Sequence, residues 1–325
     1  MNTLDADGLV LEPQTAAHAP AMFEVLSDPA IYEYENEAPP SLAWLERRFR
    51  HLESRQSADG REQWLNWVIR LPDGALAGYV QATVHADGRA AIAYELASRY
   101  WGKGLASSSV RAMIDELARA CRATTLTAIL KRPNRRSMRL LQRLGFLLAS
   151  AELHRRLHAE ADEWLMLRAA SLPAPAMRAL VFEPAESGDF EALLDLRSEA
   201  MRESLQRIGR FDPDRSRAWF LASFSPAQTR RILLDGEPIG FFATQPEEGA
   251  LRLDHLYLHP APQGRGIGAV VLGHVILEAD LQALPLRVSA LRDSSSNRFY
   301  LRHGFRLVER GDFDNHYLRP RAASR

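Results

Sequence analysis

A chain of 325 residues is long enough for two domains of ordinary size. Its 46% hydrophobic and 25% charged residues are typical of a globular protein, and its 41 basic and 41 acidic residues leave no net charge to recruit nucleic acid or a membrane. No apolar run approaches the ~18 residues that cross a bilayer. The first residues lack the basic start and apolar run of a signal peptide, so we expect a cytoplasmic protein.

The first half predicts helices, an antiparallel meander, and then alternating helices and strands. Apolar residues recur at helical spacing over 16–27 and 42–52. Pro-Asp-Gly and Ala-Asp-Gly turns separate three expected strands, at 67–71, 77–84 and 90–96. The remaining elements are expected as a helix at 106–120, a strand at 124–130, a helix at 137–144 and a strand at 164–167.

A short uncharged segment divides this half from the next. Residues 169–177 are small and contain two prolines, a composition typical of a linker. We therefore expect a first domain at 1–170, a linker at 171–178 and a second domain at 179–325.

The second half predicts the same order of elements. Helices are expected at 189–201, 216–224, 268–279 and 295–303, and strands at 180–182, 231–234, 239–244, 251–258 and 287–290. A repeated order of elements is the mark of a tandem duplication.

Two glycine turns repeat about 160 residues apart. Trp-Gly-Lys-Gly-Leu-Ala at 101–106 precedes Gly145-Phe146, and Gln-Gly-Arg-Gly-Ile-Gly at 263–268 precedes Gly304-Phe305. Each run follows a strand and opens a helix, where free backbone N–H groups and the helix dipole favour a phosphate. A nucleotide-hydrolysing loop would need Gly-Lys-Ser/Thr, and a dinucleotide fold would need G-x-G-x-x-G in a parallel unit. Neither pattern fits.

The pattern resembles the acetyl-CoA signature of the general N-acetyltransferase (GNAT) superfamily, which is Q-x-x-G-x-G after a strand and then a helix ending in Tyr-x-x-x-Gly-Phe. The first half is similar to the branch that contains the ribosomal-protein N-terminal acetyltransferases, in Leu26-Ser-Asp-Pro29, in Tyr94-Glu-Leu96 and in Asn134-x-x-Ser137. The resemblance implies two α/β domains of α+β type, each with a mixed, mainly antiparallel, twisted sheet flanked by helices. It also implies acetyl-CoA as the cofactor.

The resemblance assigns cofactor contacts in both halves. The turn would hold the pyrophosphate through Gly102, Lys103, Gly104, Leu105 and Ala106, and through Gln263, Gly264, Arg265, Gly266, Ile267 and Gly268. The preceding strand would bond pantetheine and polarise the thioester through Glu95, Leu96 and Ala97, and through Leu256, Tyr257 and Leu258. The later helix would add Asn134 and Ser137, with Asp293 and Ser296 at the matching positions. Asp293 departs from the usual asparagine, which puts that contact in doubt.

Acetyl transfer to an amine needs a neutral amine, a site for the oxyanion and a proton for the leaving thiolate. A phenol of pKa ~10 stays protonated beside a thiolate of pKa ~8.5, and Tyr300 resembles the family's general acid. The first half has Leu141 at that position, so it relies on solvent or another group or has lost catalysis. Glu95 is a candidate base, and Asp254 or His255 is its counterpart. The alternatives are a core tyrosine at 300 and an ordinary polar strand residue at 95.

The sequence thus predicts an N-acetyltransferase that acts on a primary amine of a small molecule or peptide. Protein N-termini, amino acids, polyamines, aminoglycosides and small metabolites are all compatible acceptors. One domain could instead be a non-catalytic acyl-CoA-binding or scaffolding module. Eleven basic against two acidic residues over 99–143 suit a polyanionic small ligand, a solvated helix face or, as a third possibility, nucleic acid. Scattered histidines and the single cysteine, Cys121, predict no metal site.

Overall fold

The computed structural model describes residues 1–34, 36–171, 180–207 and 209–321. The chain forms two compact units: one holds Met1–Phe146 and the segment from Glu160, and the other holds Leu147–Ala159 and the chain after the linker. The expected linker at 171–178 lies outside the described residues apart from Ser171. Within the described ranges, no helix is long and apolar enough to cross a membrane.

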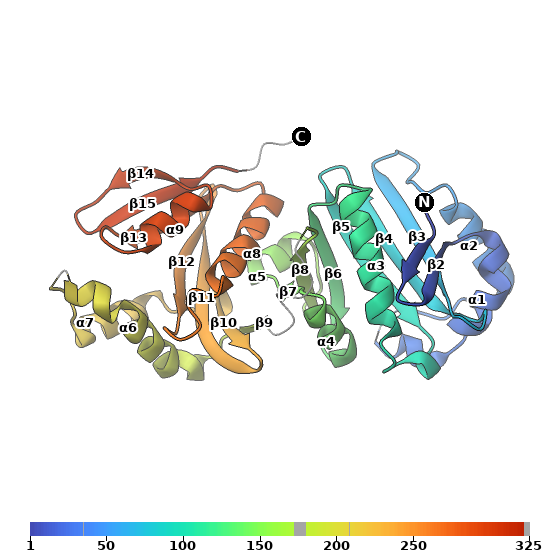
Figure 1. The fold of residues 1–325 in the computed structure, drawn as a ribbon, viewed down its shortest axis with the longest axis horizontal. Coiled ribbons are helices and arrows are strands. Elements are labelled where there is room, and N and C mark those ends of the chain that lie inside the picture. The colour runs from blue at the N-terminus through green and yellow to red at the C-terminus, as the bar shows by residue number, and fades with distance from the viewer. Residues whose placement is uncertain (35, 172–179, 208, 322–325) are drawn as a thin grey trace. The chain divides into compact units, whose positions relative to one another are not determined.

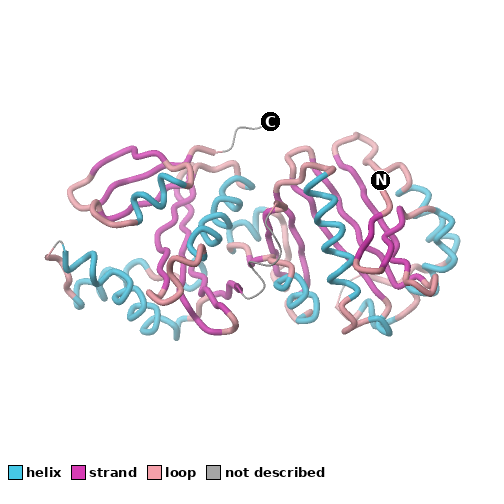
Figure 2. Tube along the Cα trace, in the orientation of Figure 1, coloured by secondary structure: helices cyan, strands magenta, loops and turns pink. Residues whose placement is uncertain are grey.

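The first sheet is mixed and mainly antiparallel (Figures 1 and 2), with strands in the order β1-β2-β3-β4-β5-β6-β8-β7. β5 and β6 pair in parallel, and the other registered neighbours pair antiparallel. The strands are β1 (Leu4–Ala6), β2 (Leu9–Pro13), β3 (Glu62–Arg70), β4 (Leu76–His85), β5 (Arg89–Leu96), β6 (Thr125–Lys131), β7 (Leu147–Leu148) and β8 (Glu163–Ala169).

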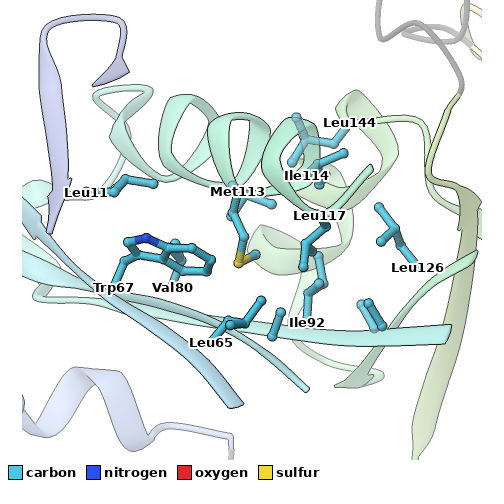
Figure 3. Close-up of a cluster of buried hydrophobic side chains, with 14 of the residues drawn as sticks. Leu11, Leu65, Trp67, Val80, Ile92, Met113, Ile114, Leu117, Leu126 and Leu144 are labelled. Atoms are coloured by element: carbon cyan, nitrogen blue, oxygen red, sulfur yellow. The ribbon is translucent and has the colours of Figure 1, made fainter. Parts of the chain in front are cut away.

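Helices pack on this sheet through two hydrophobic clusters. α3 (Leu105–Arg119) and α4 (Arg135–Arg143) contribute to the larger cluster, in which Met113, Ile114 and Leu117 point toward strand side chains such as Trp67 and Val80 (Figure 3). α1 (Ala19–Leu26) and α2 (Leu42–Leu52) form the second cluster with Val68 and Leu76. A short helix, α5 (Ala151–Arg156), follows β7. Both faces of β3 are buried: Trp67 and Ile69 join the larger cluster and Val68 joins the second, because neighbouring strand residues face opposite sides of a sheet.

The second sheet has the order β14-β15-β13-β12-β11-β10-β9. From β9 to β14, this order matches that of the first sheet from β2 to β7, and β1 has no counterpart. Its one parallel pair is β12 with β13. Its strands are β9 (Leu180–Pro184), β10 (Thr229–Leu234), β11 (Glu237–Glu247), β12 (Ala250–Leu258), β13 (Leu286–Leu291), β14 (Arg306–Arg310) and β15 (Asp314–Arg319). The helices here are α6 (Phe190–Arg207), α7 (Pro213–Ser223), α8 (Ile267–Leu281) and α9 (Ser296–Arg302).

Both sheets split at their parallel pair. β5 pairs with β6 over 89–91, and the registered pairing with β6 ends there although β5 extends to Leu96. β12 pairs with β13 over 251–253, and that pairing ends although β12 extends to Leu258. Each central strand therefore diverges from its parallel neighbour directly before the glycine turn.

The expected fold class and the duplication are confirmed, and the helix expected at 42–52 is present with those bounds. Sequence reasoning did not predict β1, β2, β7, α5, β14 or β15. β14 is exposed along its whole length and β15 is mostly polar, so neither has the alternation of apolar residues that marks a strand.

Candidate functional site

The two glycine turns have matching backbone conformations. Gly104 and Gly266 precede α3 and α8 with φ of 80° each, in the left-handed region that favours glycine, and no side chain caps either helix. The first N–H groups of both helices therefore have neither an intrahelical acceptor nor a side-chain cap. A 15-residue helix with an uncapped N-terminus favours a bound anion, and the two helices are equally long.

One side-chain hydrogen bond ties each turn to the end of its split strand. Trp101 donates its indole Nε1–H to the Leu96 carbonyl oxygen at 2.8 Å. Gln263 donates its amide Nε2–H to the Leu258 carbonyl oxygen at 2.9 Å. The first residue of each motif thus fixes the distance between strand and turn, a contact that the resemblance did not assign to it.

A second glycine pair allows a close approach behind the split strands. A Cβ added at Gly78 on β4 would lie 2.0 Å from the Glu95 carbonyl oxygen, and one at Gly240 on β11 would lie 2.3 Å from the Tyr257 carbonyl oxygen. Any side chain at these positions would force β5 or β12 to move. Sequence reasoning missed both glycines, although Leu-x-Asp-Gly-x-x-x-Gly precedes an aromatic residue at 71–79 and again at 233–241.

A cavity of about 700 Å³ opens at the split of the first sheet. It brings together eight of the ten first-half residues expected at the cofactor or catalytic positions: Glu95, Leu96, Gly102, Gly104, Leu105, Ala106, Asn134 and Ser137. Leu141, which replaces the tyrosine, is buried in the larger hydrophobic cluster. Ala97 is buried in the α1–α2 cluster, and Lys103 lies near the Tyr100 ring. Arg136, Arg139 and Arg143 of α4 also line this cavity.

Glu95 also lines a second cavity of about 480 Å³, between α2 and the sheet. Asn36 donates its Nδ2–H to the Glu95 carboxylate at 2.8 Å. Burial, followed by the nearby Glu95 carboxylate, raises the pKa of the Tyr79 phenol well above its usual value. Glu95 therefore lines both cavities, with its carboxylate hydrogen-bonded to Asn36.

Two hydroxyl groups meet in the same place. The Tyr94 and Ser137 oxygens are 2.6 Å apart, and both residues line both cavities. Asn134 accepts a hydrogen bond from the Ser137 backbone N–H at 3.0 Å and so caps α4. Tyr94 was quoted in the sequence pattern but was not assigned a role. Tyr94 and Glu95 are neighbours on one strand and were expected to face opposite sides, so the sequence did not indicate that both would line the cavities at the split of the sheet.

A cavity of about 590 Å³ opens at the split of the second sheet. It brings together six of the expected residues: Asp254, Leu256, Tyr257, Gln263, Ser296 and Tyr300. Leu258, Gly264, Arg265, Gly266, Ile267 and Gly268 lie outside its lining. Asp293 also lies outside it, and its backbone carbonyl accepts a hydrogen bond from Arg207 at 3.3 Å.

Asp254 and His255 have different surroundings because burial alternates along β12, with Asp254 on the cavity side and His255 on the buried side. The register with β11 shifts at this point, so Asp254 has no register partner on that strand, and its carboxylate lies 3.5 Å from Arg252. Burial raises the pKa of Asp254 above its usual value, against the opposing effect of Arg252. His255 is 2% exposed and packs among the rings of Trp219, Phe220 and Phe241. Burial lowers the pKa of His255 to about 3, so its ring is neutral.

Tyr300 lines the cavity at the split of the second sheet and is 6% exposed. Its ring packs against Phe299, Phe305 and Tyr317. Burial raises the pKa of the Tyr300 phenol, which keeps it protonated beside a thiolate. No cluster of three or more potential metal ligands occurs in the part of the chain that the structure describes.

A sheet split at a parallel pair, followed by an uncapped helix and a cavity with acid and base side chains, defines an acyltransferase that takes a phosphate-bearing thioester. The description "Acetyltransferase (GNAT) domain" matches the chain twice, at residues 8–147 and 228–307. Together these matches cover more than half of the chain, which belongs to the GNAT acetyltransferases and carries one such domain in each half. Acetyl-CoA is the cofactor of this family.

Known proteins resemble parts of the chain. The uncharacterized N-acetyltransferase p20 of Bacillus licheniformis is 26% identical over 148 residues, which are 45% of this chain and 83% of that protein. The structure of ribosomal-protein-S5-alanine acetyltransferase from Vibrio fischeri covers 53% of this chain and 98% of its own, with 16% identity and a TM-score of 0.44. RimJ of Mycobacterium smegmatis, in complex with CoA-disulfide, covers 52% of this chain and 86% of its own, with 20% identity and a TM-score of 0.43.

Proposed function

We propose that both domains, with bounds at 1–170 and 179–325, bind acetyl-CoA at the split of their sheets. The observation that carries this proposal is the coincidence, in each half, of the split strand and the uncapped glycine turn, with a cavity at the split. In the first half, three arginines of α4 line the cavity, which supports a polyanionic ligand as the reason for the basic excess. A location in the cytoplasm is part of the same proposal.

The second domain would acetylate a primary amine of a small molecule or peptide by direct transfer. Asp254 accepts a proton from the bound ammonium group, and the neutral nitrogen attacks the thioester carbonyl carbon. Backbone N–H groups of β12 stabilise the oxyanion. Attack forms the C–N bond, and collapse of the oxyanion then breaks the C–S bond. Tyr300 donates its proton to the departing thiolate, and the resulting phenolate takes the second proton from the nitrogen, which leaves the amide.

The first domain would use different groups for the same steps. Glu95 would accept the amine proton through water, and the hydroxyl pair of Tyr94 and Ser137 would supply a proton to the thiolate; their positions on the lining of both cavities support these roles. Leu141, which occupies the tyrosine position, is buried and apolar. This loss of the tyrosine also favours a second candidate function for the first domain, which is acyl-CoA binding without turnover.

Substitution of Tyr300 tests the mechanism of the second domain. Tyr300→Phe should lower kcat by about 10²- to 10⁴-fold, the range of general acid catalysis, with little change in the KM for acetyl-CoA. The release of CoA thiol at saturating acceptor measures the effect. Tyr317→Phe is the matched control, because that phenol packs against Tyr300 without lining the cavity. Unchanged turnover in Tyr300→Phe would remove Tyr300 from the mechanism.

A further inference from the structure

A buried arginine that lines the cavity of the second domain has neutral partners. Arg197 on α6 is 8% exposed and donates its Nη1–H to the Ser216 hydroxyl at 2.6 Å. Its guanidinium lies 4.7 Å from the Trp219 ring centroid and 5.8 Å from the Tyr257 ring centroid, and its Nε–H has no hydrogen-bond partner among the described residues. The charge of Arg197 also lowers the pKa of the Tyr257 phenol, against the larger effect of burial.

The absence of a carboxylate beside this guanidinium is unusual. A buried charge is costly unless an opposite charge is paired with it. Among the described residues, Arg197 forms no salt bridge, whereas Arg252 on the same cavity pairs with Glu247. The other arginines of this wall differ as well, because Arg215 is exposed and Arg210 stacks on Phe313 at 3.5 Å. Arg197 is therefore a buried cation with which no carboxylate among the described residues forms a direct ion pair.

The proposed base lies close to this cation. Arg197 and Asp254 line the same cavity, and the Arg197 charge lowers the pKa of Asp254 slightly, against the larger effect of burial. A ligand with its amine at Asp254 would thus place its neighbouring atoms near the guanidinium. Arginine presents a planar fork of N–H donors that matches a carboxylate.

We infer that the acceptor of the second domain is a small amine that also carries a carboxylate, of the amino-acid class, held by Arg197. This inference rests on the proposed function of the second domain. The ligand's carboxylate forms an ion pair with this guanidinium and keeps its own charge throughout the reaction. The ammonium group beside it loses one proton to Asp254, its nitrogen forms the C–N bond, and the second proton leaves to the Tyr300 phenolate once Tyr300 has protonated the thiolate. Arg197 is a substrate-binding residue that forms and breaks no bond.

The experiment compares acceptors in the full chain. Each of the proteinogenic L-amino acids is assayed beside its α-amide, with release of CoA thiol as the readout. Turnover that survives Gly104→Val and disappears in Gly266→Val belongs to the second domain. We expect at least one free amino acid to exceed its amide by about 10- to 100-fold in kcat/KM, mainly through KM, as for a charge-assisted hydrogen bond. The amine of the amide is less basic, so a larger fraction of it is neutral and ready to react. This effect favours the amide, so a preference for the acid must come from binding of the carboxylate.

Three variants separate carboxylate binding from a structural role. Arg197→Met should abolish the preference for acid over amide, and Arg197→Lys should keep part of it because the charge remains without the fork. Arg215→Met, on the same wall, should keep the whole preference. A merely structural Arg197 would weaken both kinds of acceptor equally, and the KM for acetyl-CoA reports the integrity of the cofactor site in every variant.

Two results would overturn the inference, and they differ in what they say of the proposed function. Equal kcat/KM for acids and amides in the wild type, with turnover present, would remove the carboxylate and leave the acetyltransferase intact. A second domain that acetylates none of the amines would contradict the proposed function and the inference together. Calorimetric titration with acetyl-CoA then shows whether the cofactor site itself is formed.

Discussion

Asp254 and His255 show how one residue of register decides chemistry. Both were candidates for the base, and strand alternation alone implied that at most one would face the cleft. In the structure Asp254 lines the cavity and His255 lies among aromatic rings. Burial alternates from Leu251 to Leu256, and His255 shares the face of Leu251 and Leu253, so this apolar alternation within β12 already favoured Asp254 as the cavity residue.

Asp254→Asn should remove activity and increase stability. The folded protein raises the pKa of Asp254, so its charged form is disfavoured by folding, and the wild-type stability falls as the pH rises through that pKa. The neutral amide avoids this cost at neutral pH. We expect a higher Tm near pH 7, a gain that vanishes at low pH, and a loss of second-domain turnover of about 10²-fold or more. Equal Tm values at pH 7 would contradict the burial argument.

His255 should make the second domain sensitive to acid. Its folded pKa of about 3 lies below the unfolded value of ~6.5, so the unfolded chain binds the proton more strongly. The stability from the neutral ring is complete above pH 6.5 and is lost as the pH falls toward 3, at up to about 1.4 kcal/mol per pH unit. The free energy of unfolding, measured with urea at several pH values, should fall less steeply with decreasing pH in His255→Phe than in the wild type.

At the level of elements, the split strand depends on a glycine in the neighbouring strand. Gly240→Ala places a methyl group where the Tyr257 carbonyl oxygen lies, and β12 must move. We expect a weaker affinity of the second domain for acetyl-CoA and a loss of about 1–3 kcal/mol of stability. Calorimetry and chemical unfolding measure the two effects.

The control for Gly240→Ala is the same substitution on α8. Gly273→Ala meets no atom within 4 Å and removes a glycine from a helix interior. It should stabilise the domain by about 0.5–1 kcal/mol and leave acetyl-CoA binding unchanged. Equal acetyl-CoA affinity and equal stability of the two alanine variants would show that the close approach at Gly240 does not affect cofactor binding.

The sequence predicted elements well where the apolar pattern is strong and poorly where tertiary contacts replace it. α2 repeats apolar residues at helical spacing, and its bounds were predicted without error. β14 and β15 have weak patterns, and the sheet orders them through pairing that sequence spacing does not encode. The glycine turns were predicted because their conformations restrict the residue type, whereas Arg197 lay in an ordinary amphipathic helix and gave no signal.

For the whole molecule, the duplication predicts two cofactor sites of unequal chemistry. Titration of the full chain should give two acetyl-CoA molecules bound per chain. Gly266→Val should reduce the number to one, because a β-branched residue is strained at a φ of 80°. A single site in the wild type would contradict binding by both domains, and two sites in the variant would show that the turn conformation is dispensable.

The pair of hydrogen bonds from Trp101 and Gln263 has a consequence for how such motifs are compared. An indole and a carboxamide share little beyond an N–H of suitable reach, yet each spans the same gap between strand end and turn. The chain has in effect exchanged one side chain for the other within its own repeat. The first position of the motif therefore selects a donor at a given distance, and distant members of the family could diverge there in identity while keeping the same loop geometry.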